Sequence, residues 1–263
     1  MTSPSPRISV TPVLRMTGVT KAFAGVPALR GASIDVRAGE VHGLVGENGA
    51  GKSTLIKILA GIYDRDGGEV VIDGVDAARL PPADAHRAGI RFVHQELQLV
   101  PDMTVAENVW LGNEQSAGGV LRGRAMRARV DEVLGEVLGI RLPAARLVRD
   151  LGPAERKLVK VARALVDDSA RLIVFDEPTA PLAGAEAEQL LGIVSRLRER
   201  GISSLYISHY LGEVLRVCDR VTVLRGGADV GRIDPVTPER GREMVRLMIG
   251  REIDDLYPPR RPV

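Results

Sequence analysis

The stretch "GENGAGKST", residues 46–54, is the most informative part of this sequence for its fold. It follows the largely apolar run "EVHGLV" (40–45) and opens "TLIKIL" (54–59), whose apolar residues have helical spacing. The pattern G-x-x-x-x-G-K-[ST] between a strand and a helix predicts a phosphate-binding loop, because glycines let successive backbone N–H groups wrap around an anion at the helix N-terminus. A glycine turn without a ligand is the alternative, and the order of strand, loop and helix argues against it.

The residues of this loop have different expected roles. Lys52 is expected to contact the β- and γ-phosphates of a nucleotide, and the Ser53 hydroxyl to ligate Mg²⁺. The phosphate-binding set comprises Gly46, Glu47, Asn48, Gly49, Ala50, Gly51, Lys52, Ser53 and Thr54. Lysine is rare beside arginine in this chain, and the compact point charge of lysine suits position 52. The remaining lysines are expected to be ordinary solvated side chains: Lys21, Lys57, Lys157 and Lys160.

A second set of reactive side chains follows the apolar run "RLIVF" (171–175), which is typical of a buried parallel strand. Asp176 is suited to hold Mg²⁺ directly or through water, and Glu177 to orient or deprotonate an attacking water. Alone, an Asp-Glu pair after a strand is equally typical of an ordinary loop start; its combination with the phosphate loop makes it specific. His209, after the strand "SLYIS" (204–208), is placed to contact the γ-phosphate or that water, although a lone histidine is more often structural.

The order of elements predicts an α/β protein. Residues 13–45 are strand-rich, and residues 102–166 have mostly helical spacing. From residue 171 onward strands alternate with helices, which indicates a mainly parallel sheet with helical crossovers. The helical block is therefore expected to be an insertion into the sheet domain.

Composition excludes several classes of protein. Hydrophobic residues make up 44% and charged residues 27%, which is typical of a globular chain. The net charge of +2 gives no electrostatic case for binding nucleic acid. No apolar run approaches the roughly 20 residues that span a bilayer. The single cysteine, Cys218, excludes an internal disulfide framework and a multi-cysteine zinc site, and it is expected to be buried.

These motifs together resemble the ATP-binding cassette (ABC) family of transporter subunits. "GENGAGKST" matches the Walker A loop, "LIVFDEP" (172–178) the Walker B strand and "ISH" (207–209) the switch histidine of that family. The resemblance covers nearly the whole chain and is greatest to the carbohydrate-uptake branch, such as ribose, xylose and galactoside importers. The segment "MIGREIDDLYPPR" (248–260) is similar to the end of the first half of two-cassette ATPases in that branch.

The resemblance implies a fold and a domain division. The implied fold is that of a P-loop NTPase: a mainly parallel sheet flanked by helices, with an N-terminal antiparallel β subdomain and an inserted α-helical subdomain. One ABC ATPase domain is expected over residues 12–257, with a flexible N-terminal tail at 1–11 and a C-terminal tail at 258–263. Residues 12–95 and 168–257 are expected to form the catalytic core with the β subdomain, and residues 96–167 the helical subdomain.

The same resemblance implies further site residues. Phe23 matches the aromatic residue that stacks on adenine. Gln95 is implied to ligate Mg²⁺ through its side-chain oxygen and to couple the site to the membrane subunits; from the residues alone it is more typical of an exposed polar residue at a strand end. Residues 96–112 are implied to form part of the surface that accepts the permease. Trp110 is expected in the core of the helical subdomain and not at a ligand.

One motif departs from the family pattern. In the family, the signature Leu-Ser-Gly-Gly-Gln of one subunit grips the γ-phosphate held by its partner; here the stretch is Leu151, Gly152, Pro153, Ala154 and Glu155. Gly152 lacks the serine hydroxyl, and Glu155 brings negative charge toward a phosphate. The same residues are typical of a well-capped helix start, with proline at the first position and glutamate in the first turn. The resemblance therefore implies a degenerate signature.

The implied function is that of the ATP-binding subunit of a membrane importer, which hydrolyses ATP to drive uptake of a sugar or related small solute. ATP and Mg²⁺ are the implied cofactors. The implied partners are integral-membrane permease subunits, a second cassette in a homo- or heterodimer and, indirectly, a solute-binding protein, with no nucleic acid. A peripheral position on the cytoplasmic face of the cell membrane is expected.

Two alternatives stay open at the level of sequence. The first is an ATP-binding but weakly hydrolysing regulatory subunit, which the degenerate signature permits. The second is a soluble ABC ATPase that acts on ribosomes or DNA. Fused cassettes, a charged linker, zinc cysteines or a coiled coil usually mark that second class, and this sequence shows none of them.

Overall fold

The computed structural model describes residues 12–77, 82–93, 99–180, 182 and 184–250. Its centre is a six-stranded sheet in the order β12-β11-β3-β10-β9-β6. The pairings from β11 through to β6 are parallel, and β12 joins as an antiparallel edge strand. The strands are β3 (Val41–Val45), β6 (Ile90–Val93), β9 (Leu172–Asp176), β10 (Ser203–Ile207), β11 (Arg220–Arg225) and β12 (Ala228–Ile233).

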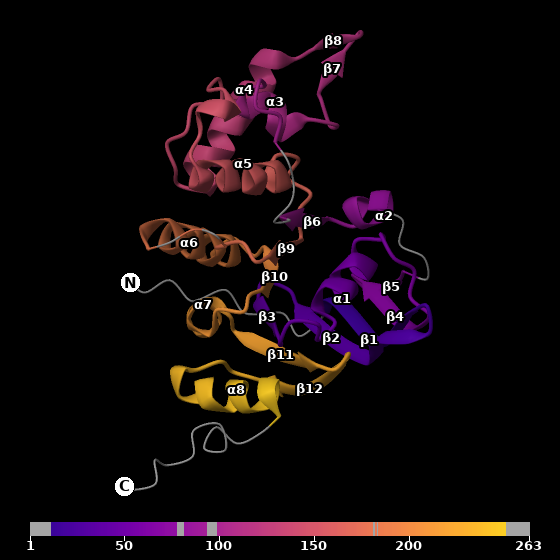
Figure 1. Cartoon of the computed structure of the whole chain (residues 1–263). Helices are drawn as coiled ribbons and strands as arrows, with labels where there is room; N and C mark the ends of the chain where they lie inside the picture. Colours follow the sequence, from indigo (N-terminus) through magenta and orange to yellow (C-terminus); the bar gives the residue numbers. More distant parts are fainter. Residues whose placement is uncertain (1–11, 78–81, 94–98, 181, 183, 251–263) are drawn as a thin grey trace, which may run out of the picture.

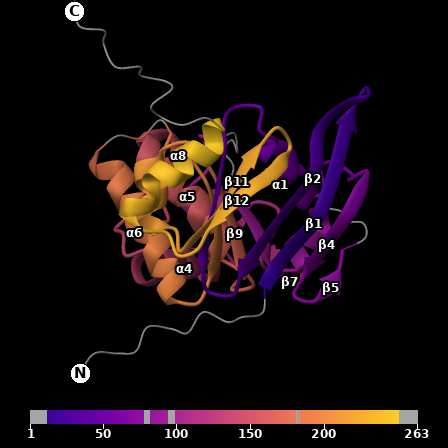
Figure 2. The same ribbon diagram turned by 90° about the horizontal axis from the view of Figure 1, so that it is seen from below.

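A second, antiparallel sheet stands beside the first, as the sequence predicted for the N-terminal region (Figures 1 and 2). Its strand order is β2-β1-β4-β5. The strands are β1 (Pro12–Phe23), β2 (Val26–Arg37), β4 (Gly67–Ile72) and β5 (Val75–Asp76). The short helix α2 (Pro82–Arg87) leads from this sheet to β6.

Both faces of the central sheet are buried. Along β9, Ile173 and Phe175 belong to one apolar cluster, whereas Leu172 and Val174 belong to another. Successive side chains of a strand point to opposite faces. The run is therefore apolar throughout because α6 (Ala185–Glu199) and α7 (Leu211–Val217) cover one face, while α1 (Lys52–Leu59) and the antiparallel sheet cover the other. Figure 2 shows these two layers on opposite sides of the central strands.

The helical block lies at one end of the molecule (Figure 1). It contains α3 (Val105–Trp110), α4 (Gly123–Glu132), a π-helical turn (Val133–Val137), a 3-10 turn (Val148–Asp150) and α5 (Pro153–Leu165). Trp110 is buried there as expected, and its indole N–H donates to the backbone oxygen of Met126 at 3.0 Å. The expectation of mostly helical spacing missed one feature, a hairpin formed by β7 (Ser116–Ala117) and β8 (Val120–Leu121). A Gly-Gly pair with positive φ forms its two-residue turn, which such hairpins favour.

The C-terminal part adds two elements beyond those the sequence predicted. Gly226 and Gly227, both with positive φ, turn the chain from β11 into β12. A 3-10 turn (Pro238–Arg240) then leads into α8 (Gly241–Ile249), which lies against β11 and β12. Cys218 is buried as expected, and burial raises the pKa of its thiol.

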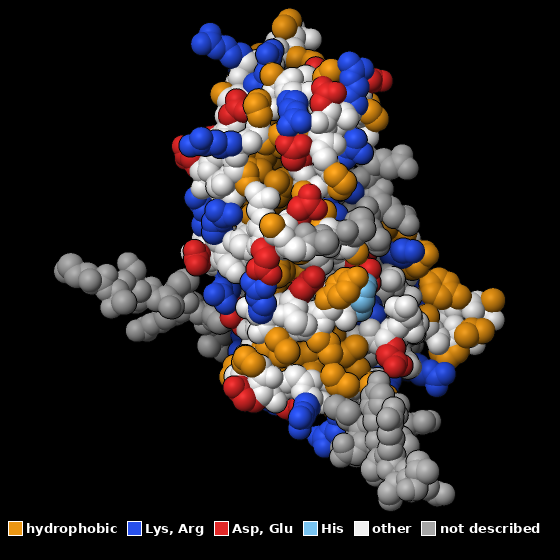
Figure 3. Space-filling view, turned by 60° about the vertical axis from the view of Figure 1, so that its left-hand side comes forward, with side chains coloured by type: hydrophobic (Ala, Val, Ile, Leu, Met, Phe, Trp, Pro, Cys, Tyr) orange, Lys and Arg blue, Asp and Glu red, His pale blue; other side chains and the backbone are white. Residues whose placement is uncertain are grey.

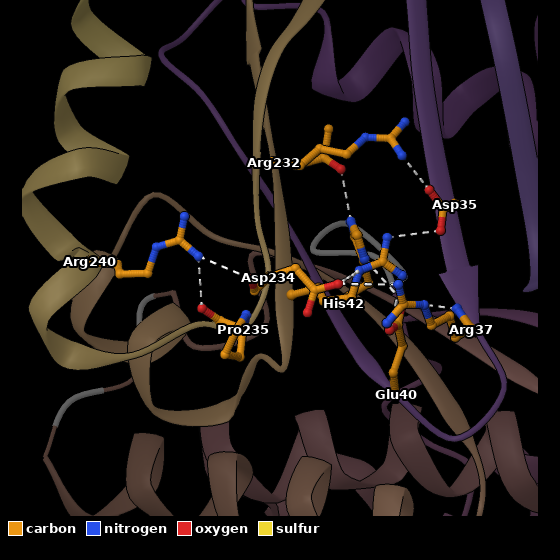
Figure 4. A network of polar contacts seen from close by, with 10 residues as sticks. Asp35, Arg37, Glu40, His42, Arg232, Asp234, Pro235 and Arg240 are labelled. Carbon is orange, nitrogen blue, oxygen red and sulfur yellow. Dashed lines mark hydrogen bonds and ion pairs between the residues drawn. The ribbon is translucent and has the colours of Figure 1, made fainter. Parts of the chain in front are cut away.

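A buried polar network ties the two sheets together (Figure 4). Arg220 of β11 donates to the Asp35 carboxylate of β2 at 2.8 Å, and its Nη1 lies 3.3 Å from both carboxylate oxygens of Glu40. Glu40 has no exposed surface and also lies 3.1 Å from Nδ1 of His42, whose Nε2 lies 2.9 Å from the Thr222 hydroxyl. Since a buried charge is tolerated only when it is paired and hydrogen-bonded, the guanidinium of Arg220 stabilises the junction of β2, β3 and β11.

We expect Arg220→Met to lower the free energy of unfolding by about 3–5 kcal/mol, because it leaves the Glu40 carboxylate buried without its guanidinium partner. Urea unfolding measures this loss. Arg232→Met is the matched control: Arg232 pairs with the same Asp35 from an exposed position, so its removal is expected to cost less than about 1 kcal/mol. Equal losses in the two variants contradict the assignment.

Candidate functional site

The loop between β3 and α1 has the geometry that a phosphate-binding loop needs. Gly51 has φ +105° and a Cβ there would lie 2.7 Å from a Leu29 side-chain carbon. A Cβ at Gly46 would lie 2.3 Å from the backbone oxygen of Leu224. Both positions therefore require glycine, because any side chain would push the loop away from its neighbouring strands.

Lys52, the first residue of α1, occupies the centre of this loop. Its ammonium donates to the backbone oxygens of Gly46 at 2.6 Å and Glu47 at 3.0 Å. The residue is 8% exposed, and burial lowers its pKa, while the carboxylates of Glu177 and Asp176 act in the opposite direction. The positive charge is thus held between the loop and the carboxylates at the end of β9.

Asp176 and Glu177 leave the sheet where β9 ends. Asp176 is the last residue of the strand, and Glu177 follows with a φ of +46°, which is uncommon for a residue with a side chain. The backbone N–H of Glu177 donates to the backbone oxygen of Ile207 in β10 at 2.9 Å. The Glu177 carboxylate lies 3.1 Å from Nδ1 of His209, so the two residues that the sequence assigned to the attacking water are in contact.

The segments that carry Glu177 and His209 are both hydrogen-bonded to one carboxylate, which the sequence analysis did not single out. One oxygen of Glu213, in α7, accepts hydrogen bonds from Thr179 at 2.9 Å, Tyr206 at 2.9 Å and Ser208 at 3.1 Å. Thr179 lies two residues after Glu177, and Ser208 directly precedes His209. Burial raises the pKa of the Tyr206 hydroxyl, and the Glu213 carboxylate acts in the same direction. The phenol therefore remains a hydrogen-bond donor over the working pH range.

A cavity of about 330 Å³ brings most of the predicted site residues together. The cavity is lined by Phe23, Ala28, Asn48, Gly49, Ala50, Gly51, Lys52, Ser53, Thr54, Asp176, Glu177 and Ile207. Phe23 is 41% exposed. Its ring packs edge-to-face against the Tyr63 ring, with 5.1 Å between the two ring centroids. The Ser53 hydroxyl and the Asp176 carboxylate are oxygen donors on the same cavity, which is the ligand type that Mg²⁺ prefers.

Other predicted residues lie elsewhere. Gln95 and residues 96–98 are outside the described part of the chain. The stretch from Leu151 to Glu155 forms the start of α5, and none of its residues is among the described lining of the cavity. Leu151 is buried, whereas Gly152 and Pro153 are exposed.

The start of α5 is well capped, as its proline and first-turn glutamate predicted. Pro153 is the first helical residue, and the Glu155 carboxylate accepts from the backbone N–H of Gly152 at 2.9 Å. Its second oxygen accepts from the Arg146 guanidinium at 2.8 Å. The negative charge of Glu155 is therefore paired within the chain.

The expectation of ordinary solvated lysines is wrong at more than one position. The Lys21 side chain is 16% exposed and pairs with Asp66 at 2.8 Å, and burial lowers the pKa of Lys160. Lys157 is not an ordinary solvated side chain, because its ammonium donates to the backbone oxygens of Pro178 and Ala180 in the segment that follows Glu177. A lysine that appears beside a helix's apolar face gives no signal of such a contact. Only the fold brings the carbonyls to it.

A buried strand, a glycine-rich loop that opens a helix, and a carboxylate pair at the end of a neighbouring parallel strand define a P-loop nucleotide-binding fold. Comparison with known families gives a more specific result. Residues 29–180 match the model of the ABC transporter family. The chain therefore belongs to the ABC transporter family, as the motifs indicated.

Relatives with named functions are close in sequence. The ribose import ATP-binding protein RbsA of Pseudomonas putida is 46% identical over 248 residues, which cover 94% of this chain and 48% of the relative. The ribose import ATP-binding protein RbsA 1 of Rubrobacter xylanophilus is 49% identical over 251 residues, covering 95% of this chain and 49% of the relative. The chain thus spans about half the length of these relatives.

Solved structures agree with the fold. The ADP conformation of MJ1267, an ATP-binding cassette of an ABC transporter, is 29% identical with a TM-score of 0.78, covering 92% of this chain and 100% of that one. A nucleotide-free ATP-binding cassette from an ABC transporter is 28% identical with a TM-score of 0.77, covering 92% of this chain and 96% of that one. The P-loop NTPase architecture predicted from sequence is therefore confirmed.

The surface of the molecule carries charged side chains of both signs. Among the described residues, none of the helices combines the length and apolar character needed to cross a bilayer. On the face shown in Figure 3, acidic and basic side chains are interspersed, so this face offers no continuous basic surface.

Proposed function

We propose that this chain is the ATP-binding subunit of a membrane ABC importer and that it hydrolyses ATP to drive uptake of a sugar or related small solute. The observation that carries the proposal is one cavity that places the phosphate loop opposite Asp176 and Glu177, with His209 in contact with Glu177. Phosphoryl transfer to water requires these parts: a cradle for the phosphates, an oxygen site for a metal ion and a group that orients water.

Each residue then has a defined task. The backbone N–H groups of residues 48–54 and the Lys52 ammonium bind the β- and γ-phosphates, and the Phe23 ring stacks on the adenine. Ser53, Asp176 and Gln95 would supply oxygen ligands for Mg²⁺, which would neutralise charge on the phosphates. Glu177 accepts a proton from the attacking water or orients it, and His209 holds the Glu177 carboxylate in place and contacts the γ-phosphate.

The transport assignment rests on the names of the relatives. Proteins called ribose import ATP-binding proteins match 93–96% of this chain. We infer the corresponding partners: integral-membrane permease subunits, a second cassette and, indirectly, a solute-binding protein. Association with a permease would place the chain on the cytoplasmic face of the cell membrane as a peripheral subunit.

The start of α5 bears on how two cassettes work together. In a head-to-tail pair, this helix start meets the nucleotide held by the partner. Gly152 offers no hydroxyl, and its backbone N–H is already bonded to the Glu155 carboxylate. We infer that this chain completes its partner's site poorly while its own phosphate loop is intact. A heterodimer with a cassette that has the full signature would then hold one efficient site, built on this chain.

We expect Glu177→Gln to lower the rate of ATP hydrolysis by at least about 100-fold while ATP still binds, because the amide cannot accept the proton of the attacking water. Steady-state phosphate release and nucleotide-binding measurements report the two effects separately. Glu186→Gln, an exposed carboxylate in α6, is the control and should leave the rate unchanged. A negligible wild-type rate that Glu177→Gln does not alter would favour the regulatory alternative.

We expect Phe23→Ala to weaken ATP binding by about 5- to 150-fold, because stacking of a base on an aromatic ring contributes about 1–3 kcal/mol. The dissociation constant is measured by calorimetry with non-hydrolysable ATP. Val26→Ala removes a neighbouring side chain that is 69% exposed and outside the cavity lining, so it serves as the control. Equal affinities for Phe23→Ala and the unmodified chain contradict the stacking role.

We expect the combined change Gly152→Ser, Pro153→Gly, Ala154→Gly and Glu155→Gln to raise ATP turnover of the chain assembled with its permease by at least about tenfold. Each restored hydrogen bond to a charged phosphate is worth about 1.5–3 kcal/mol. Glu155→Gln alone is the control: it removes the charge but supplies no hydroxyl, so its gain should be smaller. An unchanged rate in the combined variant contradicts the inferred deficiency.

A further inference from the structure

One side chain of the helical block, Lys157, is hydrogen-bonded directly to the segment after Glu177. Lys157 lies in the second turn of α5, the helix of the block that faces α6 and β9 (Figure 1). Its ammonium donates to the backbone oxygens of both Pro178 and Ala180. An ammonium offers three donors on a flexible stem, so it can bind two carbonyls of one bend at once.

The segment that Lys157 holds is also held by a second side chain, Glu213 of α7. Thr179 lies between the two carbonyls, and its hydroxyl donates to the Glu213 carboxylate at 2.9 Å. The backbone N–H of Ala180 donates to the backbone oxygen of Glu177 at 3.3 Å. Residues 177–180 are therefore fixed by Lys157 from the helical block and by Glu213 from the sheet domain.

The backbone conformation of Glu177 is the reason why these hydrogen bonds matter. A non-glycine residue with a φ of +46° lies in a sparsely populated, unfavourable region that persists only when its surroundings impose it. The hydrogen bonds that Lys157 makes to Pro178 and Ala180 are among those surroundings. Their loss would let the segment relax and move the Glu177 carboxylate away from its position beside His209.

We propose that Lys157 is a positioning residue that couples the placement of α5 to the conformation of Glu177. Lys157 lies one helical turn after Pro153, so a displacement of the first turn of α5 reaches Pro178 and Ala180 with no intervening loop. The inference deepens the proposed ATP hydrolysis and depends on it for its kinetic consequences. On this proposal, a movement of the helical block is transmitted through Lys157 to the water-orienting carboxylate of Glu177 in the same chain.

The Lys157 ammonium is expected to lose its proton within a pH range that is accessible to experiment. Burial, together with the neighbouring charge of Lys160, lowers the pKa of Lys157 to about 8, while the Glu213 carboxylate acts in the opposite direction. Above that pH the side chain is a neutral amine, whose hydrogen bonds to carbonyls are weaker than those of an ammonium. Activity that depends on Lys157 should therefore decline as the pH rises through about 8.

The kinetic test compares Lys157→Met and Lys157→Arg with the unmodified chain. We expect Lys157→Met to lower kcat by at least about tenfold with the KM for ATP changed less than about twofold, because ground-state ATP binding does not involve Lys157. Lys157→Arg keeps the charge, so it should recover part of kcat and hold it constant from pH 7 to pH 9, where the unmodified chain loses activity. Arg127→Met, which removes an exposed cation of α4, is the control and should change neither parameter.

A second measurement is independent of turnover. The backbone N–H groups of Glu177 and Ala180 are both hydrogen-bonded. Lys157→Met should speed amide hydrogen exchange at least about tenfold in the peptide that contains them, and Lys157→Arg should speed it less. The exchange of peptides from β1 and β2 should remain unchanged in both variants.

The outcomes separate the two levels of inference. If the unmodified chain binds but does not hydrolyse ATP, the proposed function fails, and the exchange experiment still decides the role of Lys157. If the unmodified chain hydrolyses ATP and Lys157→Met matches it in kcat, pH profile and exchange, the positioning role is overturned. If Lys157→Met does not fold, the pH profile and exchange of Lys157→Arg decide: an alkaline decline identical to that of the unmodified chain overturns the proposal.

Discussion

The parallel register of β10 between β3 and β9 is the constraint on which the site depends. Ile207 pairs with Leu44 of β3 on one side and with Asp176 of β9 on the other. Because parallel strands in register end at the same edge of the sheet, the phosphate loop, the Asp176–Glu177 pair and the Ser208–His209 turn all leave the sheet together. A slip of one residue in either pairing would turn these side chains to the wrong face.

Register brings the segments to one edge, but side-chain hydrogen bonds set their final geometry. Glu213 draws Thr179 and Ser208 toward one carboxylate oxygen, so the segments that carry Glu177 and His209 share a common support. Lys157 adds the only support among those described here that originates in the helical block. The unfavourable backbone of Glu177 is thus balanced by contacts from three parts of the chain, which is typical of residues held for chemistry.

Sequence alone predicted the parts of this site that are local. The strand, glycine loop and helix around Lys52 are contiguous, and Asp176 and Glu177 follow their strand directly. Two hairpin turns, at Gly118–Gly119 and Gly226–Gly227, carry a Gly-Gly pair in the sequence, which is a usable hairpin signal. The contacts of Lys157 with Pro178 and Ala180, and that of Glu213 with Thr179, had no such signal, because these partners lie 21 to 34 residues away and meet only through the packing of α5 and α7.

Glu155 shows how a contact changes the meaning of a residue. The sequence predicts that its charge is directed at the partner's phosphate, where like charges repel. In the structure the carboxylate binds the Gly152 N–H and the Arg146 guanidinium, so the repulsion is reduced by pairing. The bond to Gly152 also occupies a backbone donor where, in the proposed head-to-tail pair, the partner's phosphate would bind. On that proposal the deficiency of this helix start lies in missing donors more than in added charge, and phosphate binding would require Glu155 to release the Gly152 N–H first.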